Sequence, residues 1–213
     1  MRKRIFQWGG VAASIMLMAF GIGCLVIGMQ GRSEVQNKLA QEYIVGTPDM
    51  TPAQIKTAAQ AANLPASIVL HTCSVANQTI DTGAEAKCFA SYMRIHALEA
   101  TGGKTYSQLG RYLTPAGKDT NDATLAATDP KTGAPIANAA RETWVTETAL
   151  STALNTSFFA EQVALFSIVM GIALLLTGIG FFILTLGGAL GAFAVRKKEE
   201  AADTKLLSAG SGV

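Results

Sequence analysis

Histidine is scarce in this chain of 213 residues, and paired catalytic motifs are missing from it. There are two histidines, His71 and His96, and three cysteines, none of which forms the C-x-x-C pair used in redox catalysis. No nucleophile-elbow motif occurs. Non-haem iron chemistry needs two histidines and a carboxylate that converge, and neither histidine lies in a recognisable ligand motif. The sequence therefore predicts a protein that is not an enzyme and has no cofactor.

The sequence also lacks a large excess of charge of either sign. Seventeen Lys and Arg stand against fifteen Asp and Glu, which gives a formal net charge of +2. No block of basic residues follows a predicted soluble helix, so nucleic-acid binding is excluded as a function class.

What the sequence does have is two long uncharged apolar runs. The first extends from Trp8 to Met29, 22 residues, and the second from Val163 to Val195, 33 residues. At about 1.5 Å per helical residue, each covers the hydrocarbon layer of a bilayer, roughly 30 Å thick. The runs predict transmembrane helices over residues 8–30 and 161–195.

The charges that flank the two runs predict their orientation. Three basic residues occupy positions 2–4 and three more occupy positions 196–198. The positive-inside rule then places both termini in the cytoplasm, with a short N-terminus at 1–7 and a disordered tail at 196–213. The segment from Gly31 to Gln162 holds ten basic and twelve acidic residues, a net charge of 10 − 12 = −2. We expect a multi-pass protein of the plasma membrane with residues 31–160 outside.

A cleaved leader is the rival interpretation of the first run. A secretory signal peptide is disfavoured because the run is too long and no A-x-A site follows it. A lipoprotein signal would place a lipidated Cys24 at the new N-terminus, but residues 25–29 remain apolar. The simpler interpretation of Cys24 is a small residue packed in a membrane helix.

The sequence between the two runs predicts a mainly helical segment. Helical patterns occur at 31–45, at 52–63 behind a Thr-Pro start, and at 84–100. A stretch rich in Pro and Gly at 114–137 predicts a long surface loop. A further pattern from 139 to 159 continues without Pro or Gly into the second run. The predicted fold class is an all-α membrane protein with two transmembrane helices and a mainly helical extracytoplasmic domain.

Two cysteines, Cys73 and Cys88, lie in this predicted outer domain. Outside the cytoplasm thiols oxidise, and a bond closing this short loop would stabilise the fold by very roughly 3 kcal/mol, so we predict a disulfide. The alternative is a metal site that adds His71 and His96 to the cysteines. Their spacing matches no standard zinc pattern.

Small residues recur at four-residue spacing within the apolar runs. Such spacing lets membrane helices approach closely, either on each other or on another membrane protein. Neither run has an ionisable side chain in its interior, which disfavours a proton or ion pathway. The candidate packing residues are Gly10 and Ser14, Ala19 and Gly23, and Gly187 and Gly191.

Three segments resemble one family. The string IHALEATGGKTYSQL at 95–109 is fairly specific to a family of small actinobacterial membrane proteins, many of which carry the label aromatic ring-opening dioxygenase. The segments SEVQNKLAQEYIV at 33–45 and RETWVTETALSTALNTSFFAEQVALF at 141–166 are similar to the same family in the same order. The chain departs from the family pattern around Cys73 to Cys88 and at 114–137. The resemblance implies a two-span protein in a Gram-positive, mycolate-type envelope and no settled activity.

Three functions remain open at this point. The first is a non-enzymatic accessory or scaffold subunit of an envelope or respiratory membrane complex, with membrane lipid and a membrane protein or a second copy of the chain as partners. The second is an extracytoplasmic protein that binds or senses a lipid or a cell-wall intermediate. The third is a metal-dependent enzyme that uses His71 and His96.

Overall fold

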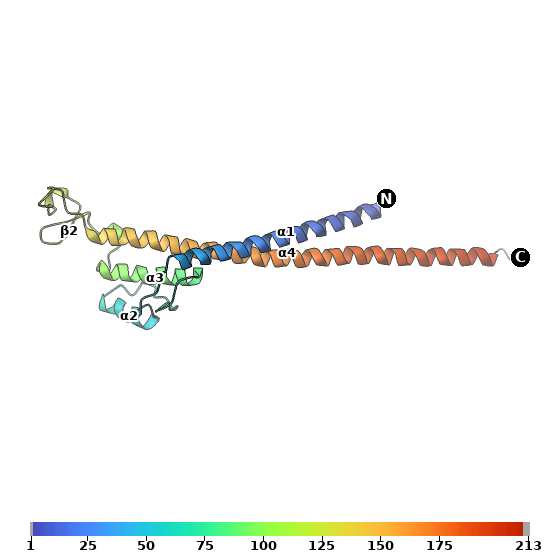
Figure 1. Ribbon diagram of the computed structural model, residues 1–213, viewed down its shortest axis with the longest axis horizontal. Coiled ribbons are helices and arrows are strands. Elements are labelled where there is room, and N and C mark those ends of the chain that lie inside the picture. The colour runs from blue at the N-terminus through green and yellow to red at the C-terminus, as the bar shows by residue number, and fades with distance from the viewer. Residues whose placement is uncertain (1, 211–213) are drawn as a thin grey trace. The chain divides into compact units, whose positions relative to one another are not determined.

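The chain is mostly helical, as the sequence predicts. The computed structural model describes the backbone of residues 2–210 and the side chains of residues 8–188. Four helices, α1 (Arg2–Gln41), α2 (Pro52–Ala61), α3 (Gly83–Ala100) and α4 (Ala139–Gly210), account for most of the described residues (Figure 1). The chain divides into two compact units, one of Met1–Gln30 with Val163–Val213 and one of Gly31–Gln162.

The first unit consists of the apolar parts of α1 and α4. Both helices are long and apolar enough to cross a membrane, which confirms that part of the prediction. Large apolar side chains project from them into the surroundings, among them Phe20, Ile27, Phe166 and Leu176, each more than half exposed. A soluble helix pair would bury such residues, whereas a bilayer solvates them.

Within this unit the two helices make a close antiparallel contact through small residues. A Cβ added at Gly21 would lie 2.9 Å from the carbonyl oxygen of Gly171, and one added at Gly178 would lie 3.0 Å from that of Ser14. Only residues with little or no side chain permit this approach. The contact, called the heptad seam below, repeats every seven residues on both helices; its residues are Ser14, Gly21 and Gly28 on α1 and Ala164, Gly171 and Gly178 on α4.

The second unit packs α2 and α3 with the ends of α1 and α4 that lie in it. Helix α2 begins as predicted, because the Thr51 side chain accepts the Gln54 N–H and Pro52 needs no N–H partner. Helix α3 supplies much of the core, including Tyr92, which is 1% exposed. The buried apolar cluster also contains Leu39, Met50, Ile55, Val75, Ile80, Ile95, Leu98, Trp144 and Leu154.

The stretch predicted to be one long loop is more ordered than the sequence indicates. Strands β1 (Tyr112–Leu113) and β2 (Asp119–Thr120) pair antiparallel, with Tyr112 opposite Thr120. Two isolated bridges add Ala137 to Tyr112 and Thr128 to Pro135. The Pro and Gly residues lie at turns, as expected. Between the turns, however, the backbone forms paired segments, where the high Pro and Gly content predicted an irregular loop.

The C-terminal part of α4 also differs from the prediction. The helix continues to Gly210, so residues 196–210 are helical where disorder was expected. The start at Ala139 agrees with the sequence pattern. The physical reason is composition: residues 196–206 contain Lys, Glu, Ala and Leu, which are good helix formers, and the breakers come only at the end.

Candidate functional site

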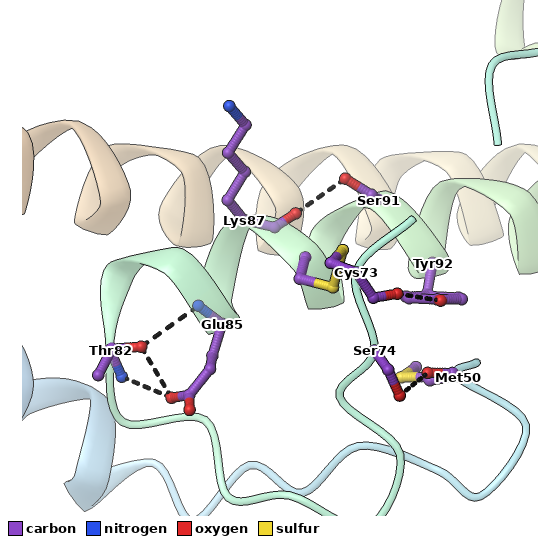
Figure 2. The surroundings of a disulfide bond; sticks show 9 residues. Met50, Cys73, Ser74, Thr82, Glu85, Lys87, Ser91 and Tyr92 are labelled. Atoms are coloured by element: carbon purple, nitrogen blue, oxygen red, sulfur yellow. Dashed lines mark hydrogen bonds between the residues drawn. A yellow bond between two sulfur atoms is a disulfide. The ribbon is translucent and has the colours of Figure 1, made fainter. Parts of the chain in front are cut away.

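The disulfide between Cys73 and Cys88 is confirmed. It joins the irregular segment after α2 to the first half of α3, with the two Cα atoms 6.1 Å apart (Figure 2). Two hydrogen bonds flank it: Tyr92 Oη donates to the carbonyl oxygen of Cys73 at 2.6 Å, and Ser74 Oγ donates to that of Met50 at 3.3 Å. Burial raises the pKa of the Tyr92 hydroxyl. The bond therefore fixes a segment with no regular structure against α3.

The N-terminus of α3 is held by a capping box. The Thr82 side chain accepts the Glu85 N–H at 3.3 Å, and Glu85 Oε2 accepts the Thr82 N–H at 3.0 Å (Figure 2). Burial acts to raise the pKa of Glu85, but the hydrogen bonds from Thr82 and from the Asp81 and Thr82 backbones outweigh it, so the pKa is lowered from 4.5. The nearby charge of Glu85 raises the pKa of Asp81.

A buried carboxylate joins three helices next to this cap. Glu161 of α4 is 5% exposed, and its Oε2 accepts the Gly83 N–H at 2.7 Å. Its Oε1 accepts from Arg32 Nε at 3.0 Å and from Gln36 Nε2 at 3.3 Å, both on α1. A Cβ at Gly83 would lie 2.8 Å from the Cα of Phe158, so only glycine lets α3 approach α4 here. The charge of Glu161 and the positive end of the α3 dipole attract each other.

His96 lies between two carboxylates. Its Nδ1 is 2.9 Å from Glu99 Oε2, and its Nε2 is 3.5 Å from Asp49 Oδ2, without hydrogen-bond geometry. The pKa of Asp49 is lowered, chiefly by a hydrogen bond from the Thr47 side chain and also by the nearby His96. Each ring nitrogen faces a different acid, so the three side chains do not converge on one point.

His71 does not join His96. His71 is exposed and lines clefts with Arg94 and Ser91, whereas His96 lines a separate cavity of about 590 Å³ with Met93 and Glu142. Among the residues that the structure describes, no three His, Cys, Asp or Glu side chains come together as a metal site would require. The cysteine sulfurs are bonded to each other and are not free to bind zinc.

Glu147 of α4 is a second buried acid that the sequence analysis did not single out. It is 6% exposed and accepts a hydrogen bond from Ser151 Oγ at 2.8 Å. It lines the same cavity as His96, but its recorded polar partners are hydroxyls of its own helix, Ser151 and Thr148. The two hydroxyl groups therefore satisfy part of the hydrogen-bonding capacity of the buried carboxylate.

A second cavity in the unit 31–162 is an apolar groove. Its volume is about 550 Å³, within the range of roughly 300–1,000 Å³ that small-molecule sites occupy. Helices α1, α3 and α4 contribute its walls, together with Glu42 and Ile44, which follow α1. The apolar side chains that line this groove are Leu39, Ile44, Phe89, Met93, Leu150, Ala153 and Leu154.

The predicted packing residues fall into three groups. Gly10 and Ser14 lie in the helix contact, since a Cβ at Gly10 would be 2.8 Å from Thr185 Oγ1 and Ser14 is fully buried. Ala19 is exposed, and a Cβ added at Gly23 or Gly187 would lie within 4 Å of no described atom beyond its own stretch of helix backbone. Gly191 lies outside the residues whose side chains are described. The contact follows a seven-residue repeat, because two turns of each helix bring the same face back to its partner.

Sequence reasoning missed two of these features for different reasons. Glu161 and Gly83 are 78 residues apart, and nothing local marks their pairing. The heptad seam, in contrast, could have been predicted from the sequence, because Gly21 and Gly28 are seven residues apart, as are Gly171 and Gly178. Four-residue spacing drew attention to Gly23 and Gly187 instead.

Comparisons with models of protein families, with curated proteins and with solved structures find no significant match to this chain.

Proposed function

We propose that the chain is a non-enzymatic, two-span membrane protein that serves as an accessory or scaffold subunit of a larger envelope or respiratory membrane complex. In this proposal both termini are cytoplasmic and residues 31–160 form an extracytoplasmic domain. The basic residues at 2–4 and 196–198 support this orientation. The disulfide supports it independently, because such bonds persist in oxidising compartments.

The scaffold proposal rests on small residues of the two apolar helices that lie outside the contact between α1 and α4. Gly23 and Gly187 each leave open space where a Cβ would be, and Ala19 is exposed. Small residues on the surface of a membrane helix let the helix of a second protein approach closely. We infer that these positions contact a partner membrane protein.

The buried polar groups of the unit 31–162 are consistent with a role without catalysis. Glu161 binds a helix N-terminus and an arginine, and Glu147 is held by hydroxyls of its own helix. Nucleophilic catalysis would need a nucleophile and a base within hydrogen-bond reach, held by a third group. His96, a candidate base, instead lies between the carboxylates of Glu99 and Asp49.

Site-specific photocross-linking in native membranes tests the scaffold proposal. A photoreactive amino acid at position 23 or 187 should give an adduct with a different membrane protein at native expression. The same amino acid at Phe166, which is 65% exposed and large in the natural chain, serves as the control. Adducts with lipid alone, or only with a second copy of the chain, at all three positions would refute the proposal.

The orientation has its own test. In a Cys24→Ser background, a cysteine introduced at Thr132, which is exposed, should react in intact cells with a maleimide that cannot cross membranes. A cysteine added after Val213 should react only after permeabilisation. The reverse pattern would contradict the proposed topology without bearing on the partner.

A further inference from the structure

The apolar groove has walls suited to an aliphatic chain. Leu39 and Leu154 are each 5% exposed, whereas Leu150 on the same helix as Leu154 is 47% exposed. Phe89 is the one aromatic residue among the lining side chains, and the flexible Met93 adapts to a ligand without a fixed shape. A groove lined mainly by apolar side chains accepts apolar ligands.

Three polar residues, Lys38, Glu42 and Ser157, line the groove. The two charged ones limit the charge that its ligand can carry. Lys38 supplies the positive charge, and its Nζ lies 3.7 Å from Glu34 Oε1, beyond hydrogen-bond range. Both side chains are about two-thirds exposed, at 66% and 68%, and such ion pairs contribute little. Lys38 can therefore bind another carboxylate. Glu42 also lines the groove and repels anions, and it repels a phosphate dianion more strongly than a singly charged carboxylate.

From this combination we propose that the apolar groove binds one long-chain fatty acid. The alkyl chain lies against Leu39, Phe89 and Leu154, and the carboxylate pairs with the ammonium group of Lys38. A volume of about 550 Å³ suits one chain. The proposal goes beyond the scaffold role, because the groove belongs to residues 31–162 alone and needs no partner protein.

The test uses the full-length protein in nanodiscs of zwitterionic lipid and a palmitate analogue that carries a photoreactive diazirine. After irradiation, mass spectrometry of peptides should place the label on residues 89–93 and 150–157. Excess palmitate should prevent labelling, and hexadecanol, which lacks the carboxylate, should compete at least tenfold less well. A label confined to residues 8–29 and 163–188 would overturn the proposal, since it would report bilayer partitioning.

Matched variants identify the groove and its charge. Ala153→Trp fills the groove, so labelling should fall at least tenfold, whereas Ala149→Trp, the same change at an exposed position of α4 that does not line it, should label normally. Lys38→Met should remove the preference for palmitate over hexadecanol, and Lys56→Met, at an exposed position of α2, should keep it.

Two results would contradict the assignment. Equal labelling of the two tryptophan variants would place the ligand elsewhere. Competition by an anionic phospholipid but not by palmitate would assign the groove to a lipid headgroup instead of a fatty acid. Neither result depends on whether positions 23 and 187 cross-link to a partner, so this proposal and the scaffold proposal fail separately.

Discussion

Replacing Glu161 with alanine should loosen the attachment of α3 to α1 and α4. The carboxylate accepts the N–H of Gly83 at 2.7 Å and receives Arg32 Nε at 3.0 Å, and it is almost fully buried. Alanine removes both interactions, together with the hydrogen bond from Gln36 Nε2, and leaves the buried Gly83 N–H without an acceptor. The Arg32 side chain is 46% exposed and can return to solvent.

The expected magnitude follows from these environments. A hydrogen bond to a charged group contributes about 1.5–3 kcal/mol, and an unsatisfied buried N–H costs about 1–3 kcal/mol. The Arg32 contribution is small because its partial exposure screens the pair. The total for Glu161→Ala is about 2–3 kcal/mol, which corresponds to a roughly 30- to 150-fold change in the equilibrium between closed and open α3. Glu161→Gln keeps one acceptor and should cost about 1 kcal/mol.

Hydrogen exchange of the full-length protein in detergent measures this effect directly. Amides in the first turn of α3, residues 83–86, should exchange roughly 30- to 150-fold faster in Glu161→Ala than in the natural protein. The increase in exchange rate should be smaller in Glu161→Gln. Glu142→Ala, an exposed carboxylate of the same helix, is the control and should leave these amides unchanged. If Glu161→Ala and Glu142→Ala gave the same exchange rates, the carboxylate would not hold the helix.

Three further predictions concern the disulfide, the capping box and the heptad seam. Cys73→Ser with Cys88→Ser should lower the free energy of unfolding by about 3 kcal/mol, measured by chemical denaturation; an unchanged midpoint would contradict the stabilising role. The pKa of Glu85 is lowered from 4.5 on folding, so its contribution is complete above 4.5 and is lost as the pH falls through the folded pKa. Thermal unfolding between about pH 6 and about pH 3 should therefore vary less with pH in Glu85→Gln than in the natural protein, and equal slopes would count against this cause. Gly171→Leu overfills the seam and should lower thermal stability in detergent by about 1–3 kcal/mol, whereas Gly180→Leu, which faces open space, should not.

Local chemistry in the sequence predicts much of the helical framework. Thr51 and Pro52 mark the start of α2 because their side chains and ring suit a helix N-terminus. The pattern also places the end of α3 at Ala100, before the two glycines at 102 and 103, which adopt positive φ. The disulfide is predictable because a short loop separates two cysteines and leaves few alternatives.

Contacts between distant segments are not predictable in the same way. The groove combines Leu39, Phe89 and Leu150 from three helices, and its existence depends on how those helices pack. The hydrogen bond from Tyr92 to the backbone of Cys73 requires the irregular segment to adopt one particular course. The β1–β2 pairing escaped prediction because strands of two residues carry no periodic signal.

The heptad seam makes the apolar helix pair sensitive to insertions and deletions. One residue inserted in α1 between Ser14 and Gly28 would turn every later position by about 100° about the helix axis. Gly28 would then point away from Ala164, and a bulkier neighbour would take its place against the α4 backbone. An insertion of seven residues would restore the face but displace it by about 10 Å along the axis. The number of residues between the small positions is therefore fixed, while the outward-facing apolar side chains can vary in size and shape.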